Sequence, residues 1–439
     1  MSVDNKVKVL FVVGGYLPIS IGGTLRVEKI IKYLSKENKV DCKVFAQDLS
    51  DSGKYDVING IEVFRTNTYD LGKSYLKLKS IFKKKRKSIP KDQKKINTSK
   101  GRLADNYFVP DIAMLWAFFC CYKLSRVIKR TGIQIVYSSS PNASNHFIVY
   151  LARKIFGSKF IWVTEFRDPW ITNPFRNKKK APFEYLDHKL EKAVLKSSDS
   201  IIVTSQKYKD EFLEKNEFLS PYKIYYIPNG YDSEDFAFLE NVCKRKNHTF
   251  TILSAGGYYE KRSLLPFLKA FELALVENPD LENQIQFIHY GTLDVASQIY
   301  LQTNTVKGVY IRGEISHQKC LEEMYHADCL LLIPGPGNGT MPGKTFEYLA
   351  LGIPILALVD EGPSKKLIED LMAGVVIGIQ DVDRLKKALL NFNEELGISV
   401  DRKAILSSIS KYDRKNIALE VSNVVISSLV KQFKNHLSK

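Results

Sequence analysis

The sequence lacks the long apolar run that a membrane-spanning helix requires. Its longest candidate, residues 113–122, is well short of the roughly 20 residues needed to cross a bilayer and is followed by Lys123. The first residues lead directly into a strand-like run, without the apolar core and small-residue cleavage site of a signal peptide. We therefore expect a cytoplasmic protein.

Metal-binding patterns are also missing. The chain has six cysteines and seven histidines, but no C-x-x-C pair and no H-x-x-x-H spacing. We expect buried free thiols and no bound metal. The D-x-D tripeptide at residues 381–383 resembles a metal–sugar-nucleotide motif, but it stands just before a helical run, so helix capping explains it better.

Two catalytic fingerprints are absent as well. No G-x-G-x-x-G loop follows the first strand, which counts against an NAD enzyme. No G-x-S-x-G elbow is present, which counts against an esterase or protease.

Acidic residues are scarce in one region. The formal net charge is +17, and residues 73–102 hold 13 Lys or Arg against one acid, Asp92. A basic amphipathic segment of this kind suits an anionic membrane surface, on the inner face of the plasma membrane in a cytoplasmic protein. The alternative is a solvated surface loop. Nucleic-acid binding is disfavoured because the segment has few aromatic side chains to stack on bases.

What the chain does have is an alternation of short apolar strands with helical periodicity. Such alternation predicts an α/β fold with parallel sheets covered on both faces. Two series of this kind predict two Rossmann-like domains that face a central cleft. We expect strands at residues 7–13, 40–45, 61–65, 133–137, 160–164, 201–204, 224–227, 250–255, 286–290, 309–312, 329–333, 355–358 and 374–379.

The predicted domains divide at a turn-rich segment that begins at Pro228. Residues 1–230 form an N-terminal domain with a basic insert at about 70–105. Residues 231–412 form a C-terminal domain. Residues 413–439 form a helix whose apolar stripe packs back on the N-terminal domain.

The segment 334–358 is the strongest functional signal. A glycine-rich loop runs into a short helix, which Gly352 ends, and Lys344 and Glu347 fall in the first helical turn. Amides at a helix start attract phosphate, while a carboxylate can accept hydrogen bonds from a ribose diol. The alternative is a structural corner in which Glu347 only complements the helix dipole.

Ligands of open α/β sheets bind beyond the carboxyl ends of the strands. The strand at 160–164 ends in Glu165, Arg167 and Asp168, which either serve a ligand or form an internal ion pair of Arg167 with one of the two acids. The strand at 250–255 leads through two glycines to Arg262, which we expect to begin a helix. An arginine at this position can bind a diphosphate; the alternative is a surface basic residue.

Two more strand ends carry weaker signals. Gly22 and Gly23 open a helix and could lie close to a phosphate or sugar, or simply form a tight turn. The strand at 133–137 ends in serines that include Ser140, with His146 one turn into the next helix. His146 is either a ligand donor or a packed helix histidine.

These motifs, in their order, resemble the retaining glycosyltransferases of family 4, which have the GT-B fold. The likeness rests on GG-T-x-R-x-x-K, EFRDPW, IPNGYDSEDF, AGGYYEKR and GKTFEYLALGIPIL, and spans nearly all of the chain except the basic insert. Within the family it is most similar to bacterial surface-polysaccharide enzymes.

The resemblance implies a nucleotide-diphosphate-sugar donor and retention of configuration without a bound metal. Glu347 would hold the ribose hydroxyls. The implied donor-binding set is Gly22, Gly23, Arg262, Asn338, Gly339, Thr340, Lys344, Thr345 and Glu347. The implied acceptor-binding set is Ser140, Glu165, Arg167 and Asp168, and the implied catalytic set is Asp168, Arg262 and Lys344.

Two departures from the family pattern stand out. Many members carry E-x7-E, but the first glutamate falls at Gly339, where Asn338, Thr340 or the Gly339 amide would have to substitute. A family histidine is also missing from the strand end that reads SSSPN. The donor sugar is therefore left open.

The sequence thus predicts a glycosyltransferase acting on a glycan or polyprenyl-linked acceptor in cell-surface polysaccharide synthesis. One alternative is another GT-B enzyme that uses nucleotide sugars, of the 2-epimerase type. A second is a basic nucleic-acid-binding or scaffold protein with a degenerate site.

Overall fold

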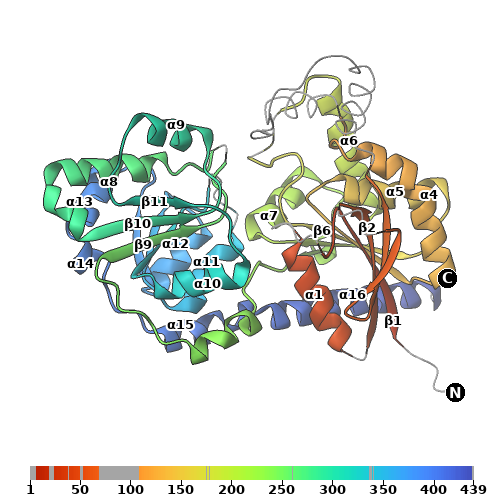
Figure 1. Ribbon diagram of the computed structural model, residues 1–439. Coiled ribbons are helices and arrows are strands. Elements are labelled where there is room, and N and C mark those ends of the chain that lie inside the picture. Colours follow the sequence, from red (N-terminus) through yellow and green to blue (C-terminus); the bar gives the residue numbers. More distant parts are fainter. Residues whose placement is uncertain are drawn as a thin grey trace, which may run out of the picture. The chain divides into compact units, whose positions relative to one another are not determined.

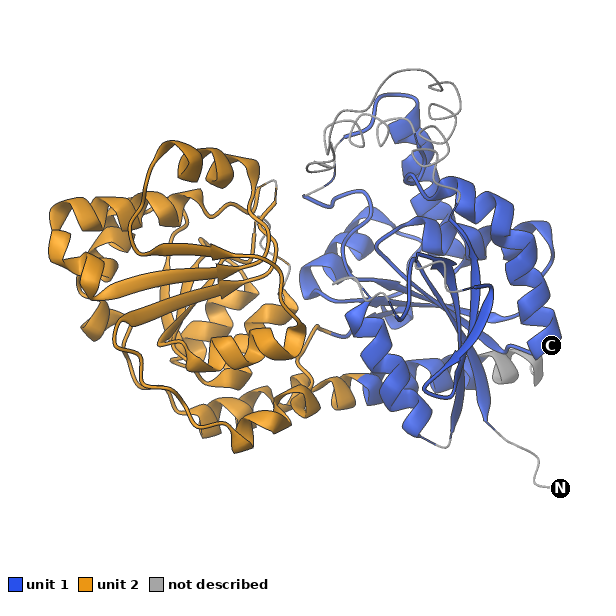
Figure 2. Ribbon diagram, viewed as in Figure 1, with its two compact units in different colours: residues 1–227, 418–439 blue, residues 228–417 orange. Residues whose placement is uncertain are grey.

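The chain folds as two compact units, residues 1–227 with 418–439, and residues 228–417 (Figure 2). The computed structural model describes residues 6–18, 24–37, 39–49, 53–68, 108–174, 176, 178–259, 261–335, 339 and 341–437. The chain passes between the units a few residues from the domain limits expected at 230 and 412. The basic segment 73–102 lies outside the described residues.

Unit 1 is built on one eight-stranded sheet (Figure 1). Its strands are β1 (Val7–Val13), β2 (Val40–Asp48), β3 (Tyr55–Ile58), β4 (Ile61–Asn67), β5 (Ile135–Ser139), β6 (Ile161–Phe166), β7 (Ser200–Val203) and β8 (Ile224–Tyr226). Its helices are α1 (Leu25–Lys36), α4 (Met114–Thr131), α5 (Ser144–Ile155), α6 (Phe183–Ser197), α7 (Gln206–Lys215) and the larger part of α16 (Arg414–Leu437).

The strand order in unit 1 is β3-β4-β2-β1-β5-β6-β7-β8. All pairs are parallel except β3 with β4. From β1 the chain moves outward to β2 and then returns to β5 on the other side of β1. The order therefore reverses between β1 and β5, where open α/β sheets place ligands.

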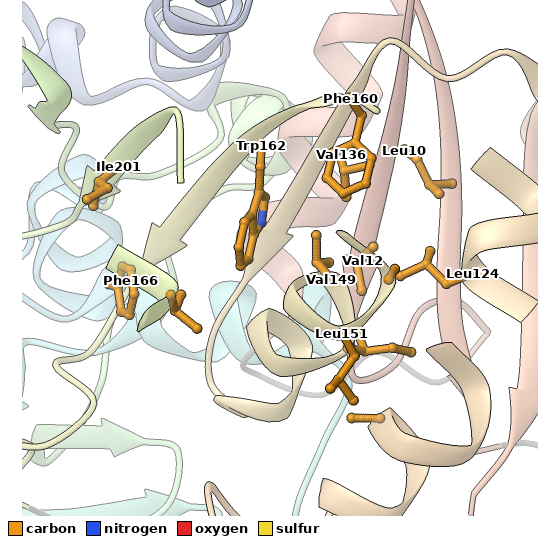
Figure 3. Packing of buried hydrophobic residues seen from close by; sticks show 14 of the residues in the cluster. Leu10, Val12, Leu124, Val136, Val149, Leu151, Phe160, Trp162, Phe166 and Ile201 are labelled. Atoms are coloured by element: carbon orange, nitrogen blue, oxygen red, sulfur yellow. The ribbon is translucent and has the colours of Figure 1, made fainter. Parts of the chain in front are cut away.

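Strand β1 shows how the sheet is covered on both faces. Leu10 and Val12 pack into a cluster with Leu124 of α4 and Val149 of α5 (Figure 3). The alternate residue Phe11 is also fully buried and lies 5.0 Å from the Tyr137 ring. A parallel strand buried on both sides reads as a continuous apolar run, which is why β1 could be located from sequence.

Helix α16 covers unit 1 at the end of the chain. Its Val421 and Val425 are fully buried. The Ser428 hydroxyl lies 2.7 Å from that of Ser200 in β7, and the Ser422 hydroxyl lies 3.5 Å from the Glu37 carboxylate at the end of α1. The apolar stripe predicted from sequence therefore packs on unit 1.

Unit 2 contains a six-stranded, all-parallel sheet. Its strands are β9 (Phe250–Ala255), β10 (Ile285–Tyr290), β11 (Val309–Arg312), β12 (Cys329–Leu332), β13 (Ile355–Leu358) and β14 (Gly374–Ile377). Its helices are α8 (Leu265–Glu277), α9 (Val295–Thr303), α10 (His317–His326), α11 (Gly343–Leu351), α12 (Pro363–Asp370), α13 (Val382–Leu390), α14 (Phe392–Glu395) and α15 (Arg402–Ile409).

The order in unit 2 is β11-β10-β9-β12-β13-β14, so it reverses between β9 and β12. One buried cluster includes Leu253, Leu330 and Ile355, and another includes Ile252, Leu331 and Leu356. Adjacent residues of the same strands thus belong to different clusters, as expected for a sheet packed on both faces. The predicted α/β class with two Rossmann-like domains is confirmed.

Three finer sequence predictions meet different outcomes in the structure. The helical run expected after the D-x-D tripeptide forms two helices, α13 and α14, separated at Asn391. All six cysteines are free; five are buried and Cys243 is exposed. Within the described residues, no helix combines the length and apolarity that crossing a bilayer would take.

Close strand packing in unit 2 generates a prediction. A Cβ on Gly374 would lie 1.9 Å from the backbone oxygen of Ile355, its partner in β13, so the two strands must separate to accept alanine. Gly374→Ala is expected to lower the free energy of unfolding by about 1–3 kcal/mol, measured by urea denaturation. Gly313→Ala is the control, because a Cβ there meets nothing within 4 Å. Equal stability of the two variants would contradict this packing.

Candidate active site

The loops that flank the reversal point of unit 2 approach each other closely. Gly256, just after β9, has a φ of +107°, and a Cβ there would lie 2.6 Å from Cε of Lys344. Gly291, just after β10, has a φ of +137°, and a Cβ there would lie 2.1 Å from the Gly256 oxygen. These two positions need glycine both for conformation and for space. The lysine stem therefore lies directly against the end of β9.

Arg262 reaches the same edge of the sheet. Its Nε donates a hydrogen bond to the Ile333 oxygen at 2.5 Å, just beyond β12, and its guanidinium carbon lies 5.5 Å from the centre of the Tyr258 ring. The side chain is partly exposed. The site thus holds two cations, from the loop after β9 and from the start of α11.

The prediction that Arg262 begins a helix is wrong. Arg262 forms a β-bridge with Tyr259, and α8 begins only at Leu265. The Asp294 carboxylate accepts hydrogen bonds from the Leu264 amide at 3.1 Å and from the Ser263 hydroxyl at 2.9 Å. These contacts hold the preceding turn outside the helix.

Helix α11 carries the acidic group of the site. Glu347 is the fifth residue of α11 and begins its second turn, whereas the sequence predicted a position in the first turn. Its side chain is 12% exposed and accepts a hydrogen bond from His317 at 3.3 Å, with the Lys344 ammonium 4.0 Å away. Burial alone raises its pKa, but the His317 hydrogen bond and the charges of Lys344, His317 and Arg414 lower it to about 2.

His317, at the start of α10, links Glu347 to a second carboxylate. Its Nδ1 lies 3.9 Å from the Asp235 carboxylate, opposite the nitrogen that meets Glu347. The Glu347 hydrogen bond raises the pKa of His317 above its ordinary value, more than burial lowers it. His317 therefore lies between the carboxylates of Asp235 and Glu347, and Glu347 stays ionised at neutral pH.

The remaining donor residues predicted from sequence are less informative. Thr345 is fully buried, and its hydroxyl lies 3.2 Å from that of Ser364 inside unit 2. Gly339 lies in a buried turn. The predicted donor residues Gly22, Gly23, Asn338 and Thr340 lie outside the described residues.

In unit 1 the residues predicted to bind an acceptor lie at the ends of β5 and β6. Glu165 is fully buried, and Arg26 of α1 donates to its Oε1 at 2.8 Å while the Ser139 hydroxyl donates to its Oε2 at 2.6 Å. Burial raises its pKa, but Arg26, Arg167 and Ser139 together lower it. Glu165 therefore forms its ion pair with Arg26 of α1, and both Glu165 oxygens are occupied.

Arg167 and Ser140 fix the loop to its neighbours. The Arg167 Nε donates to the Ser140 oxygen, and the Thr204 hydroxyl donates to the Arg167 oxygen at 2.6 Å. The Ser140 amide donates to the Glu165 oxygen at 3.0 Å. These contacts join the ends of β5, β6 and β7.

Asp168 differs from its neighbours. It is half-buried, and within the described residues its carboxylate accepts no hydrogen bond and forms no ion pair. Burial raises its pKa, and the nearby charge of Arg167 only partly opposes this. A carboxylate of this kind can accept a proton or a substrate hydroxyl.

Two alternatives from the sequence are resolved. His146 is fully buried, its Nδ1 lies 2.8 Å from the Ser138 hydroxyl, and burial lowers its pKa to about 3, so it is a packed helix histidine. Asp381 accepts a hydrogen bond from the Arg384 amide at 3.0 Å and caps α13. Across the described ranges, no three His, Cys, Asp or Glu side chains gather closely enough to hold a metal ion.

A cavity of about 530 Å³ lies in unit 1 between α6, α7 and the loop that follows Asp168. Its lining includes Ile171 and Phe212, three lysines on the two helices, and Glu191. The Glu191 carboxylate accepts a hydrogen bond from the Ile171 amide at 3.2 Å, and burial raises its pKa to about 7. The lining also includes Glu211, which lies 3.6 Å from the Lys215 ammonium, so the cavity combines apolar side chains with charges of both signs.

Solved structures share this architecture. Sucrose-phosphate synthase from Thermosynechococcus elongatus has a TM-score of 0.66 at 15% identity, covering 97% of this chain and 100% of that one. The lipopolysaccharide outer core galactosyltransferase WaaB has a TM-score of 0.58 at 14% identity, covering 96% and 99%. An E. coli trehalose-6-phosphate structure bound with UDP-2-fluoro glucose has a TM-score of 0.66 at 13% identity, covering 95% and 98%. At these identities the likeness establishes the fold.

Sequence families agree with the fold. Residues 93–235 match the family described as Glycosyltransferase Family 4, and residues 249–394 match the one described as Glycosyl transferases group 1. The chain is a GT-B glycosyltransferase similar to family 4. An uncharacterized glycosyltransferase of Methanocaldococcus jannaschii is 20% identical over 401 residues, 89% of this glycosyltransferase and 90% of the relative.

The contact between His317 and Glu347 in unit 2 of this glycosyltransferase can be tested directly. Glu347→Gln is expected to lower the pKa of His317 toward its ordinary value of 6.5, because the amide carries no negative charge. The measurement is an NMR pH titration of the imidazole protons. Glu323→Gln on the same helix as His317 is the control, since Glu323 pairs with Arg245 and Lys319 instead. An unchanged His317 titration would show that the pair does not form.

The same variant also has a stability readout. The pKa of Glu347 in the folded state lies below its ordinary value of 4.5. The stability that the ionised Glu347 carboxylate adds to the folded state is therefore fully present above pH 4.5 and is lost as the pH falls through about 2. Glu347→Gln should therefore lose less stability than the parent protein over that pH range.

Proposed function

We propose that this protein transfers a sugar from a nucleotide-diphosphate-sugar donor to a glycan or lipid-linked acceptor. The transfer retains the anomeric configuration and serves cell-surface polysaccharide synthesis. The observation that carries the proposal is the gathering of Arg262, Lys344 and Glu347 at the reversal point of the unit 2 sheet. Open α/β sheets bind nucleotides at this position.

In unit 2, each part of a nucleotide diphosphate has a suitable partner. Arg262 and Lys344 supply positive charge for the two phosphates, and the first amides of α11 add donors, since Pro342 before them offers no side-chain cap. Glu347, held ionised by His317 and Lys344, can accept two hydrogen bonds from a ribose diol.

The same cations account for the chemistry that we propose. When the bond between the sugar and the diphosphate breaks, negative charge grows on the departing phosphate oxygens. Arg262, Lys344 and the α11 amides are fixed in place before the reaction, so they can stabilise that charge without reorganising and without a metal ion. Retention is part of the proposal because the family resemblance implies it, and the anomeric configuration of the product tests it.

In unit 1 we assign Asp168 to the acceptor. Its half-buried carboxylate can orient or deprotonate the attacking hydroxyl, while Glu165, Arg167 and Ser140 position the loop that carries it. We place the remainder of the acceptor in the neighbouring cavity, whose lining includes apolar side chains and three lysines beside two glutamates. A lipid-linked acceptor would place the reaction at the inner face of the plasma membrane.

Two of the structural neighbours support these assignments by analogy. The E. coli trehalose-6-phosphate structure is bound with UDP-2-fluoro glucose, and WaaB is a lipopolysaccharide outer core galactosyltransferase. Both share the fold of this chain, which makes a nucleotide-sugar donor and a surface-glycan acceptor reasonable choices.

The donor site predicts a selective thermal shift. One nucleoside diphosphate from a panel of UDP, GDP, ADP and TDP should raise the melting temperature, since a ligand that binds only the folded protein stabilises it. Arg262→Ala and Glu347→Ala should each weaken that binding about tenfold or more, through loss of a hydrogen bond to a charged group. Arg312→Ala, at an exposed arginine on β11, is the control. If none of the four nucleotides shifts the wild type, or both site variants respond like the control, the donor site is misassigned.

The acceptor role of Asp168 gives a second prediction. Asp168→Asn is expected to reduce sugar transfer about 10²–10⁴-fold while leaving the nucleotide-induced thermal shift unchanged. Glu214→Gln, at an exposed carboxylate on α7, is the control. Transfer would be measured with radiolabelled donor and isolated membrane lipids or polysaccharide. Full transfer activity in the Asp168 variant would remove this residue from the mechanism.

A further inference from the structure

The outer face of α4 is aromatic. The inner face packs Trp116, Leu124 and Ile128 into the core of unit 1, as an amphipathic helix should. On the outer face, however, the side chains of Phe118 and Tyr122 are 58% and 57% exposed. A solvent-facing helix side normally carries polar residues, so this stripe requires an explanation.

The stripe continues onto the end of α5, which packs beside α4 (Figure 1). The Tyr122 ring lies 5.5 Å from that of Phe156, just after α5, and the neighbouring Ile155 is 57% exposed. We call this surface the α4 face. Its apolar members are Phe118, Phe119, Tyr122, Ile155 and Phe156, and its exposed cations are Lys123, Arg126, Lys129, Arg130 and Lys154.

The charge of this region has one sign. No acidic residue occurs from residue 112 to residue 164, whereas the stretch contains seven Lys or Arg. At the average acidic content of the chain, a stretch of this length would hold about six acids. Within the described part of the chain, Lys123, Arg126, Lys129 and Lys154 form no ion pair. Elsewhere surface lysines such as Lys319 do pair with glutamates.

Aromatic rings next to unpaired cations match the interface of an anionic bilayer. Aromatic and aliphatic side chains enter the headgroup region, and lysines and arginines contact the acidic headgroups. Single-stranded RNA would need an open ring face on which a base can stack. The Tyr122 ring has a less open face, because the Phe156 ring lies against it and the Arg126 guanidinium carbon lies 6.0 Å from the centre of the Tyr122 ring. We propose that the α4 face docks this protein on an anionic lipid bilayer.

The α4 face is made of residues other than 73–102 in the sequence, and the proposal does not depend on the proposed reaction. It predicts binding of the full chain to vesicles of phosphatidylcholine mixed with phosphatidylglycerol, and weaker binding to phosphatidylcholine alone. Lys123→Glu/Arg126→Glu should lower the partition coefficient tenfold or more, given about 1 kcal/mol per cation near the surface. Phe118→Ser/Tyr122→Ser should also lower it. The measurement is vesicle flotation at fixed salt, because screening weakens the electrostatic part.

Two control variants make the same kinds of substitution at exposed positions of unit 2. Lys269→Glu/Lys387→Glu alters two exposed lysines on the packed helices α8 and α13 of unit 2. Tyr310→Ser removes another exposed aromatic that has an arginine beside it. Both control variants should bind vesicles like the wild type. If the α4-face variants also do so, or if the controls lose as much binding, the docking surface is not the α4 face.

Insertion itself has a spectroscopic signature. The side chains of the three native tryptophans are 0–6% exposed. Tyr122→Trp therefore adds a single indole that is exposed to water before vesicles are added. Its emission should shift to shorter wavelength with phosphatidylglycerol vesicles and stay unchanged with single-stranded RNA. A shift with RNA and none with vesicles would identify a nucleic-acid surface instead and overturn the proposal.

Discussion

One buried ion pair sets the geometry of unit 1. Arg26 and Glu165 are 2% and 0% exposed, and they join α1 to the end of β6 across 139 positions of sequence. The same guanidinium donates to the Ile227 oxygen at 3.0 Å, where the chain leaves the unit. Removing one member of such a pair leaves an uncompensated buried charge, at about 3–5 kcal/mol. Three remote segments are thereby fixed to one another.

That pair also decides which acid of the β6 loop is open to chemistry. Arg26 and Ser139 occupy both oxygens of Glu165, and the Ser140 oxygen accepts from Arg167. Asp168 is the one left with raised proton affinity and no hydrogen-bond partner among the described residues. In unit 2 the equivalent constraint is backbone proximity: Gly256 and Gly291 let two loops touch, and Lys344 lies against them.

The parts of the fold that can be predicted from sequence are those with a local cause. The strands expected at 7–13, 250–255 and 355–358 coincide with β1, β9 and β13, because a strand covered on both faces is an apolar run bounded by turns. The contacts of His317 and of Arg26 cannot be predicted in this way, because each depends on a partner brought near only by folding. Arg262 lies outside its predicted helix because Asp294, from a later loop, holds the turn before α8.

Helix α16 has a consequence for how the chain can be divided. Its first residues are held in unit 2, where the Arg414 amide donates to the Tyr231 oxygen at 2.7 Å, while its later residues cover β7. The polypeptide therefore crosses between the units twice. No single cut in the gene yields two complete halves, because a fragment ending at Ile227 would lack the part of α16 that belongs to unit 1, including the buried Val421 and Val425. A recombination event that exchanged residues 228–417 would therefore have to preserve the last twenty-odd residues of the recipient.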